Sequence, residues 1–162
     1  MKIHFLVVLF LSYVSFSLAD FHDKQEFKGK DIYISRIKKN WFDALDYCRK
    51  KKYTLLTIKS SEENANALAS IEKLMEKKDE DHIWIGGFQF RPDKPKAYRW
   101  VSDLKKIVDV FTDWAPGEPN HGRNINEFCM EFFTKKSANI DMKWNDHVCS
   151  NEQYFICEKR KN

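Results

Sequence analysis

Four cysteines constrain the fold of this 162-residue chain more than any other feature. They are Cys48, Cys129, Cys149 and Cys157. An even number of cysteines is typical of proteins that fold in an oxidising compartment, where structural disulfides persist. Four cysteines can pair in three ways, and their spacing alone does not choose among them. We therefore expect disulfides to hold the fold, in a pairing that the spacing leaves open.

The first residues have the pattern of a signal peptide. Lys2 precedes an apolar run over 5–11, and Ser17 and Ala19 place small residues where a signal peptidase reads the chain. The alternative is a membrane anchor, but serines interrupt the stretch and it falls short of the roughly 20 residues that a spanning helix needs. The pattern predicts a signal peptide over 1–19 and a secreted, extracellular domain over 20–162.

Composition narrows the class of protein and of partner. Aromatic residues make up 15% of the chain and include five tryptophans, which favours one compact domain with a real core. The formal net charge is +4, and the lysines are spread over several short runs. Because they form no arginine-rich stripe interleaved with aromatics, a nucleic-acid partner is not expected. Membrane insertion is not expected either.

Two helices are indicated in the first half of the domain. Asn40 is a plausible N-cap for a helix through about Lys51, and Ser60 with Glu63 forms a capping-box signature for a second helix. The predicted core face of the first helix is Trp41, Ala44, Leu45 and Cys48, and that of the second is Ala65, Leu68, Ala69, Ile71, Leu74 and Met75.

Strand patterns surround these helices and dominate the second half. They are expected within 27–37 and over 53–58, 82–88, 98–101, 127–133, 142–144 and 154–158. Residues 114–126 are rich in Pro, Gly and Asn, which indicates an irregular loop. Helices first and short antiparallel strands around a long loop afterwards predict an α+β fold.

Hard oxygen donors gather in three short stretches near the C-terminus. They are Glu118 and Asn120 around Pro119, Glu127 before Cys129, and Asn145-Asp146 after Trp144. Three carboxylates and two amides suit calcium, which takes six to eight oxygens, and the absence of a soft ligand argues against zinc or copper. Each stretch alone reads as a turn, a surface acid or a core tryptophan. Their joint arrangement predicts a Ca2+ site.

These stretches, with others, carry a family resemblance. The matching landmarks are Trp84-Ile85-Gly86-Gly87, Trp114, Glu118-Pro119-Asn120, Glu127 before Cys129, Trp144-Asn145-Asp146, and the spacing from Cys149 to Cys157. Over nearly all of 20–162 the chain resembles the C-type lectin family. The resemblance implies two helices and two small antiparallel sheets with a long calcium-binding loop region. It also implies disulfides Cys48–Cys157 and Cys129–Cys149, and a cis bond between Glu118 and Pro119.

The resemblance also implies a site and a function. Glu118, Asn120, Glu127, Asn145 and Asp146 look like both the calcium ligands and the sugar-binding residues. In this family the Glu-Pro-Asn order accompanies mannose-type sugars: mannose, N-acetylglucosamine, glucose and fucose. The expected protein is a secreted lectin for such glycans, including microbial ones in innate immunity, with an oligomer to supply avidity.

Two points set limits on that expectation. Asn120 and Glu127 are one residue further apart than in mannose-binding members, so the loop 121–126 could alter selectivity. His121 and His147 flank the site and are expected to be surface or packing residues. The alternative function is a protein-binding or toxin-like module that does not bind sugar. A hydrolase using Glu118 with His121 is rejected, because no motif supplies a nucleophile with an oriented base.

Overall fold

The computed structural model describes residues 20–27, 29–76, 80–90, 97–121 and 126–161. The predicted signal peptide 1–19 lies outside these residues and stays a prediction. Within the described chain, neither helix is long and apolar enough to cross a membrane.

Both helices begin where the sequence predicts. Helix α1 spans Trp41–Lys50, and the Asn40 side chain accepts a hydrogen bond from the backbone N–H of Asp43 at 2.9 Å. Helix α2 spans Ser61–Leu74, and the Ser60 hydroxyl accepts from the N–H of Glu63 at 3.1 Å. Each cap satisfies a backbone donor that has no partner inside its helix.

The strands lie close to the predicted segments, with different ends. They are β1 (Gln25–Phe27), β2 (Lys30–Ile34), β3 (Thr54–Leu55), β4 (Glu80–Gln89), β5 (Tyr98–Trp100), β6 (Glu127–Lys135), β7 (Ile140–Val148) and β8 (Tyr154–Arg160). Short 3-10 turns follow β5 (η2, Ile107–Asp109) and β6 (η3, Lys136–Ala138). Strand β7 is much longer than the predicted 142–144 and continues through Asn145 and Asp146.

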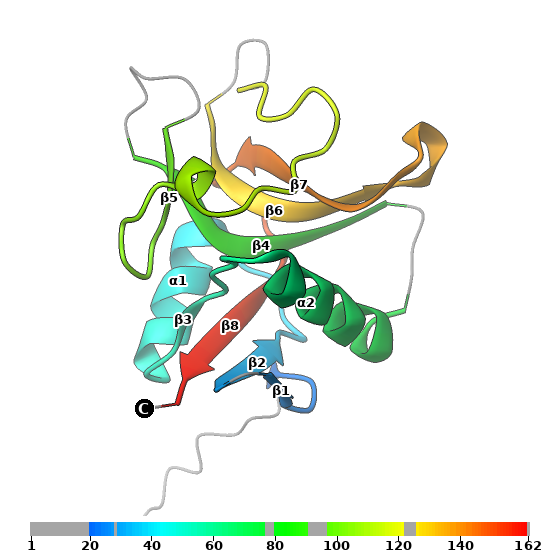
Figure 1. Ribbon diagram of the computed structural model, residues 1–162. Coiled ribbons are helices and arrows are strands. Elements are labelled where there is room, and N and C mark those ends of the chain that lie inside the picture. The colour runs from blue at the N-terminus through cyan, green and yellow to red at the C-terminus, as the bar shows by residue number, and fades with distance from the viewer. Residues whose placement is uncertain (1–19, 28, 77–79, 91–96, 122–125, 162) are drawn as a thin grey trace, which may run out of the picture.

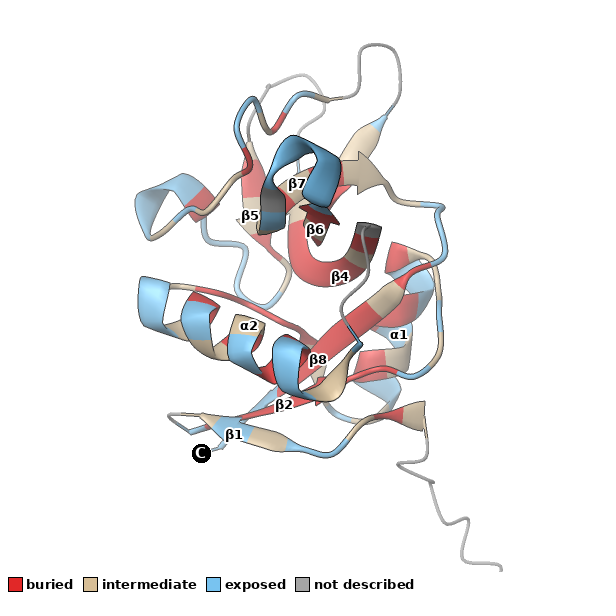
Figure 2. Cartoon of the chain, turned by 90° about the vertical axis from the view of Figure 1, so that its right-hand side faces the viewer, coloured by how far each residue is buried: buried red, intermediate tan, exposed pale blue. Residues whose placement is uncertain are grey.

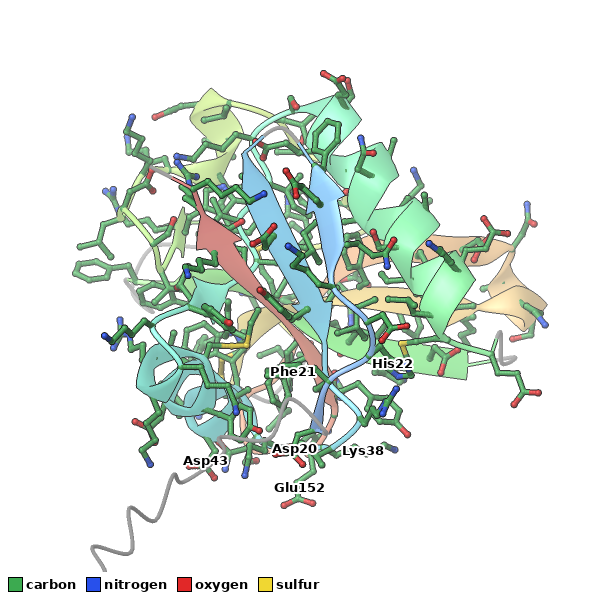
Figure 3. The ribbon with its side chains drawn as sticks, turned by 90° about the horizontal axis from the view of Figure 1, so that it is seen from below. Asp20, Phe21, His22, Lys38, Asp43 and Glu152 are labelled. Atoms are coloured by element: carbon green, nitrogen blue, oxygen red, sulfur yellow. A yellow bond between two sulfur atoms is a disulfide. The ribbon has the colours of Figure 1, made fainter. Side chains whose placement is uncertain are left out.

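The strands form one mixed sheet rather than the two small antiparallel sheets that the resemblance implied. The order is β1-β2-β8-β4-β6-β7, with β3 on β8 and β5 on β4. Strands β4 and β8 run parallel, with Ile83 opposite Tyr154 and Trp84 opposite Phe155, and this pairing joins the two antiparallel groups. The α+β class is confirmed. In Figures 1 and 3, β1, β2 and β8 lie side by side between the two helices.

Two disulfides link distant segments. Cys48 in α1 bonds to Cys157 in β8, and Cys129 in β6 bonds to Cys149 just after β7. This is the pairing that the resemblance implies. The predicted core face of α1 is buried throughout, and Figure 2 shows the buried surfaces of both helices turned towards β2, β4 and β8.

The predicted core face of α2 is partly wrong. Ala65 and Ala69 are exposed, and the buried residues include the polar Asn64. Asn64 donates from its amide to Asp113 at 2.8 Å and accepts from the Trp144 indole N–H at 3.1 Å. A polar side chain with both partners satisfied is stable in the interior, so hydrophobic periodicity alone misplaces this face.

Candidate metal centre

The buried carboxylate of Asp146 lies at the centre of the candidate site. Strand β7 places it inward, fully buried, where the Tyr98 hydroxyl donates to Oδ2 at 2.8 Å. The backbone N–H groups of Asn120 and His121 donate to its Oδ1 and Oδ2 at 3.1 and 2.9 Å. One carboxylate of the sheet therefore anchors the loop that carries the Glu-Pro-Asn motif.

Glu118 and Asn120 lie on either side of Pro119 and contact each other. The bond between Glu118 and Pro119 is cis, as the resemblance implies, and the Asn120 amide donates to Glu118 Oε1 at 2.8 Å. The second carboxylate oxygen, Oε2, is buried and has no hydrogen-bond partner in the described chain. Burial, followed by the contact with the Asp146 carboxylate, raises the pKa of Glu118 to about 7. The Glu118 carboxylate is thus held beside that of Asp146 with one of its own oxygens lacking a donor in the described chain.

Glu127 adds a third carboxylate at the start of β6. Burial and the negative charge of Asp146 raise the pKa of Glu127. His147, whose Nδ1 lies 3.5 Å from Glu127 Oε1, offsets part of this rise. Like charges at close range disfavour ionisation, and a positive charge placed among these carboxylates would relieve their mutual repulsion. The carboxylate oxygens of Glu118, Glu127 and Asp146 therefore fit a hard divalent ion such as calcium. Among them, Glu118 Oε2 has no hydrogen-bond partner in the described chain.

Asn145 is the predicted ligand whose side chain is engaged elsewhere. Adjacent residues of a strand point to opposite faces, and Asn145 lies beside Asp146 in β7. Its amide donates to Glu131 Oε1 at 2.8 Å, away from the contacts of Asp146. The structure therefore brings together Glu118, Asn120 and Asp146 by direct contacts and Glu127 through charge, while the Asn145 amide nitrogen bonds to a different residue.

Three further residues belong to this neighbourhood and were not predicted as site residues. Tyr98 donates to Asp146, His121 donates through its backbone and stacks on Tyr98, and His147 faces Glu127. The two histidines were expected to be surface or packing residues, and each does pack against a ring, His121 on Tyr98 and His147 on His82, while one ring nitrogen of each also lies 3.5 Å from a carboxylate. Tyr98 carried no motif, and only the β4–β5 pairing brings it here. Of the loop 121–126, residues 122–125 lie outside the described chain, so its effect on selectivity stays a prediction.

Comparison with known proteins identifies relatives over most of the chain. The family model "Lectin C-type domain" matches residues 37–159. A salivary C-type lectin 2 from Aedes albopictus is 25% identical over 94% of this chain and 98% of its own length. A C-type lectin mannose-binding isoform from Notechis scutatus scutatus is 30% identical over 94% of this chain and 95% of its own. The solved structure of an SPL-1–GlcNAc complex is 28% identical, with a TM-score of 0.68 over 84% of this chain and 91% of that chain.

Proposed function

This chain belongs to the C-type lectin family, and on that basis we propose that it is a secreted, calcium-dependent lectin for mannose-type sugars. The family is carbohydrate-binding and not enzymatic, and two disulfides support the lectin domain. The predicted signal peptide and the relative named as salivary support secretion.

The pair Glu118 and Asp146 is the observation that carries the calcium assignment. Their carboxylates lie together, and Glu118 Oε2 is buried with no hydrogen-bond partner among the residues that the structure describes. The pKa of Glu118 is raised to about 7. A bound calcium would supply positive charge and open coordination positions for two sugar hydroxyls. We propose Glu118, Asn120, Glu127, Asn145 and Asp146 as its ligands, with Asn145 using its amide carbonyl oxygen because its nitrogen donates to Glu131.

The same side chains can address the sugar by hydrogen bonds. An Asn amide donates and a Glu carboxylate accepts. Asn120 Nδ2 and Glu118 Oε1 lie 2.8 Å apart, so the two side chains can bind one sugar hydroxyl from both sides. The Glu-Pro-Asn order and the relative named as mannose-binding support the mannose class. Few contacts per monosaccharide imply weak single-site affinity, so avidity on microbial glycans would come from several copies of the domain.

Retention on immobilised mannose tests the proposal. The protein should bind in calcium and elute with EDTA, and the double variant Glu118→Gln, Asn120→Asp should move its preference towards galactose. Glu152→Gln, at an exposed residue, is the matched control and should bind like the unaltered chain. Retention that survives EDTA would contradict calcium-mediated binding. If neither sugar is retained in calcium, the alternative of a protein-binding module takes its place.

A further inference from the structure

A second cluster of metal-ligating side chains lies beside the proposed calcium site. His82, Glu131 and His147 each place one ligand atom so that all three atoms lie within 4.8 Å of one another. The residues come from β4, β6 and β7, which are neighbours in the sheet. Phe133 pairs with His82 and Cys129 pairs with His147, and Glu131 lies midway between them in β6, so strand register brings the three side chains to one face of the sheet.

The carboxylate of Glu131 is incompletely satisfied. The residue is fully buried, and its Oε1 lies 3.0 Å from His82 Nδ1 and accepts from the Asn145 amide at 2.8 Å. Its Oε2 is buried and has no hydrogen-bond partner among the described residues. The contacts with His82 and Asn145 satisfy Oε1 only. Burial of Oε2 without a hydrogen bond is therefore a net cost to the folded state.

The geometry resembles the ligand set of an open metal site. Two ligand atoms on a tetrahedral zinc, each about 2.0–2.1 Å from it, are about 3.3 Å apart, and His82 Nδ1 and Glu131 Oε1 are already close to that separation. The His82 and His147 rings stack at 5.5 Å and are partly exposed, so small side-chain rotations can bring their nitrogens closer. His82 and His147 also line a surface cavity, through which an ion and a water ligand can enter.

The remaining polar neighbours can orient the ligands. The two ring nitrogens of His147 lie near Asn151 and Glu127, at 2.8 and 3.5 Å, so whichever nitrogen binds the ion, the other has a polar contact. The Asn145 amide, on the neighbouring strand β7, donates a hydrogen bond to the Glu131 carboxylate. Such outer contacts fix the tautomer and direction of metal-binding side chains.

We propose that His82, Glu131 and His147 form a second site, which binds a divalent transition-metal ion of the zinc class. Two imidazole nitrogens and one carboxylate oxygen suit zinc, cobalt(II) or nickel(II), whereas calcium prefers an all-oxygen shell. The site is therefore distinct in chemistry from the oxygen-lined site around Asp146. The ion would bridge β4, β6 and β7 and offset the negative charge of the buried Glu131 carboxylate, whose Oε2 has no hydrogen-bond partner among the described residues.

Isothermal titration of zinc into chelator-treated protein tests this site. The protein should carry no polyhistidine tag, and saturating calcium should be present so that the oxygen-lined site is filled. We expect one zinc per chain, with binding more than about 100-fold weaker in His82→Gln, Glu131→Gln and His147→Gln, because each removes a ligand. The variant His22→Gln, at a histidine outside this cluster whose backbone N–H donates to Ile34, should bind like the unaltered chain.

Cobalt(II) absorption supplies a second readout, since tetrahedral coordination by nitrogen and oxygen gives strong visible bands. His82 and His147 are partly exposed, so their variants should fold, which far-ultraviolet circular dichroism checks. Failure of the unaltered protein to bind micromolar zinc would overturn the proposal. So would equal affinity in all three ligand variants and the His22→Gln control. Because sugar retention is measured separately, loss of zinc binding leaves the lectin proposal untouched.

Discussion

Acid should weaken calcium binding at a pH well above the ordinary carboxyl range. The pKa of Glu118 is raised to about 7 in the metal-free protein by burial and by Asp146, so a proton must leave before this side chain can bind the ion. Competition by one proton at that pKa makes the apparent calcium affinity about 30-fold weaker at pH 5.5 than at pH 8. The pKa of Glu127 is also raised, which adds to the loss.

Titration calorimetry in buffers with different ionisation enthalpies measures this proton directly. At pH 6 close to one proton, about 0.9, should be released from Glu118 for each calcium bound. The variant Glu118→Gln should bind calcium more weakly, and its affinity should depend less steeply on pH. An affinity that stays constant from pH 8 to pH 6, with release below about 0.2 proton, would refute the reasoning.

The same shift has a consequence for stability without calcium. The folded-state pKa of Glu118 lies above its ordinary value of 4.5, so the folded chain binds more protons than the unfolded chain between the two values. The contribution of Glu118 to the unfolding free energy is therefore present at low pH and is lost as the pH rises through about 7. In EDTA, the melting temperature of the unaltered protein should rise on acidification from above pH 7 towards pH 5, and that of Glu118→Gln should rise less.

Three further predictions concern stability, each measured by urea unfolding with the disulfides intact. Tyr98→Phe removes the hydroxyl that donates to the Asp146 carboxylate and should cost roughly 1.5–3 kcal/mol. Gly86→Ala places a Cβ 2.8 and 2.9 Å from two backbone carbonyl oxygens, which cannot rotate away, and should cost about 1–3 kcal/mol. Lys30→Met removes a buried cation 3.3 Å from the buried carboxylate of Glu158 and should cost about 3–5 kcal/mol.

An exposed lysine is the control for the last change. Lys50 pairs with Asp46 on the surface of α1, so Lys50→Met should leave the unfolding free energy nearly unchanged. A Lys30→Met protein as stable as Lys50→Met would show that Glu158 does not depend on the Lys30 charge. Full stability in Tyr98→Phe or Gly86→Ala would likewise contradict the contacts that motivate those predictions.

Local chemistry accounts for what the sequence predicts well. Asn40 and Ser60 mark the starts of both helices because a capping side chain bonds to a backbone group only three residues away. The oxygen donors around Pro119 were likewise recognisable because the residues stand next to each other in the chain. The disulfide pairing required the family resemblance, since cysteine spacing left three possibilities.

Contacts between distant segments account for what the sequence did not predict. The parallel pairing of β4 with β8 joins residues far apart in the chain and leaves no local pattern. Asn145 and Asp146 read as a turn pair, but β7 extends through them and separates their side chains. Strand register likewise brings His82 and His147 to Glu131, a grouping that no spacing in the sequence indicates.

The Cys48–Cys157 bond and the sheet order have a practical consequence for immobilising this C-type lectin domain. The C-terminal strand β8 ends beside β1 and β2, at the end of the molecule opposite the loop that carries Glu118 and Asn120 (Figure 1). A chain attached to a bead, sensor or scaffold through its C-terminus would therefore direct that loop outwards. Reducing agents would cut the covalent link between β8 and α1, so such an attachment should be made and used under oxidising conditions.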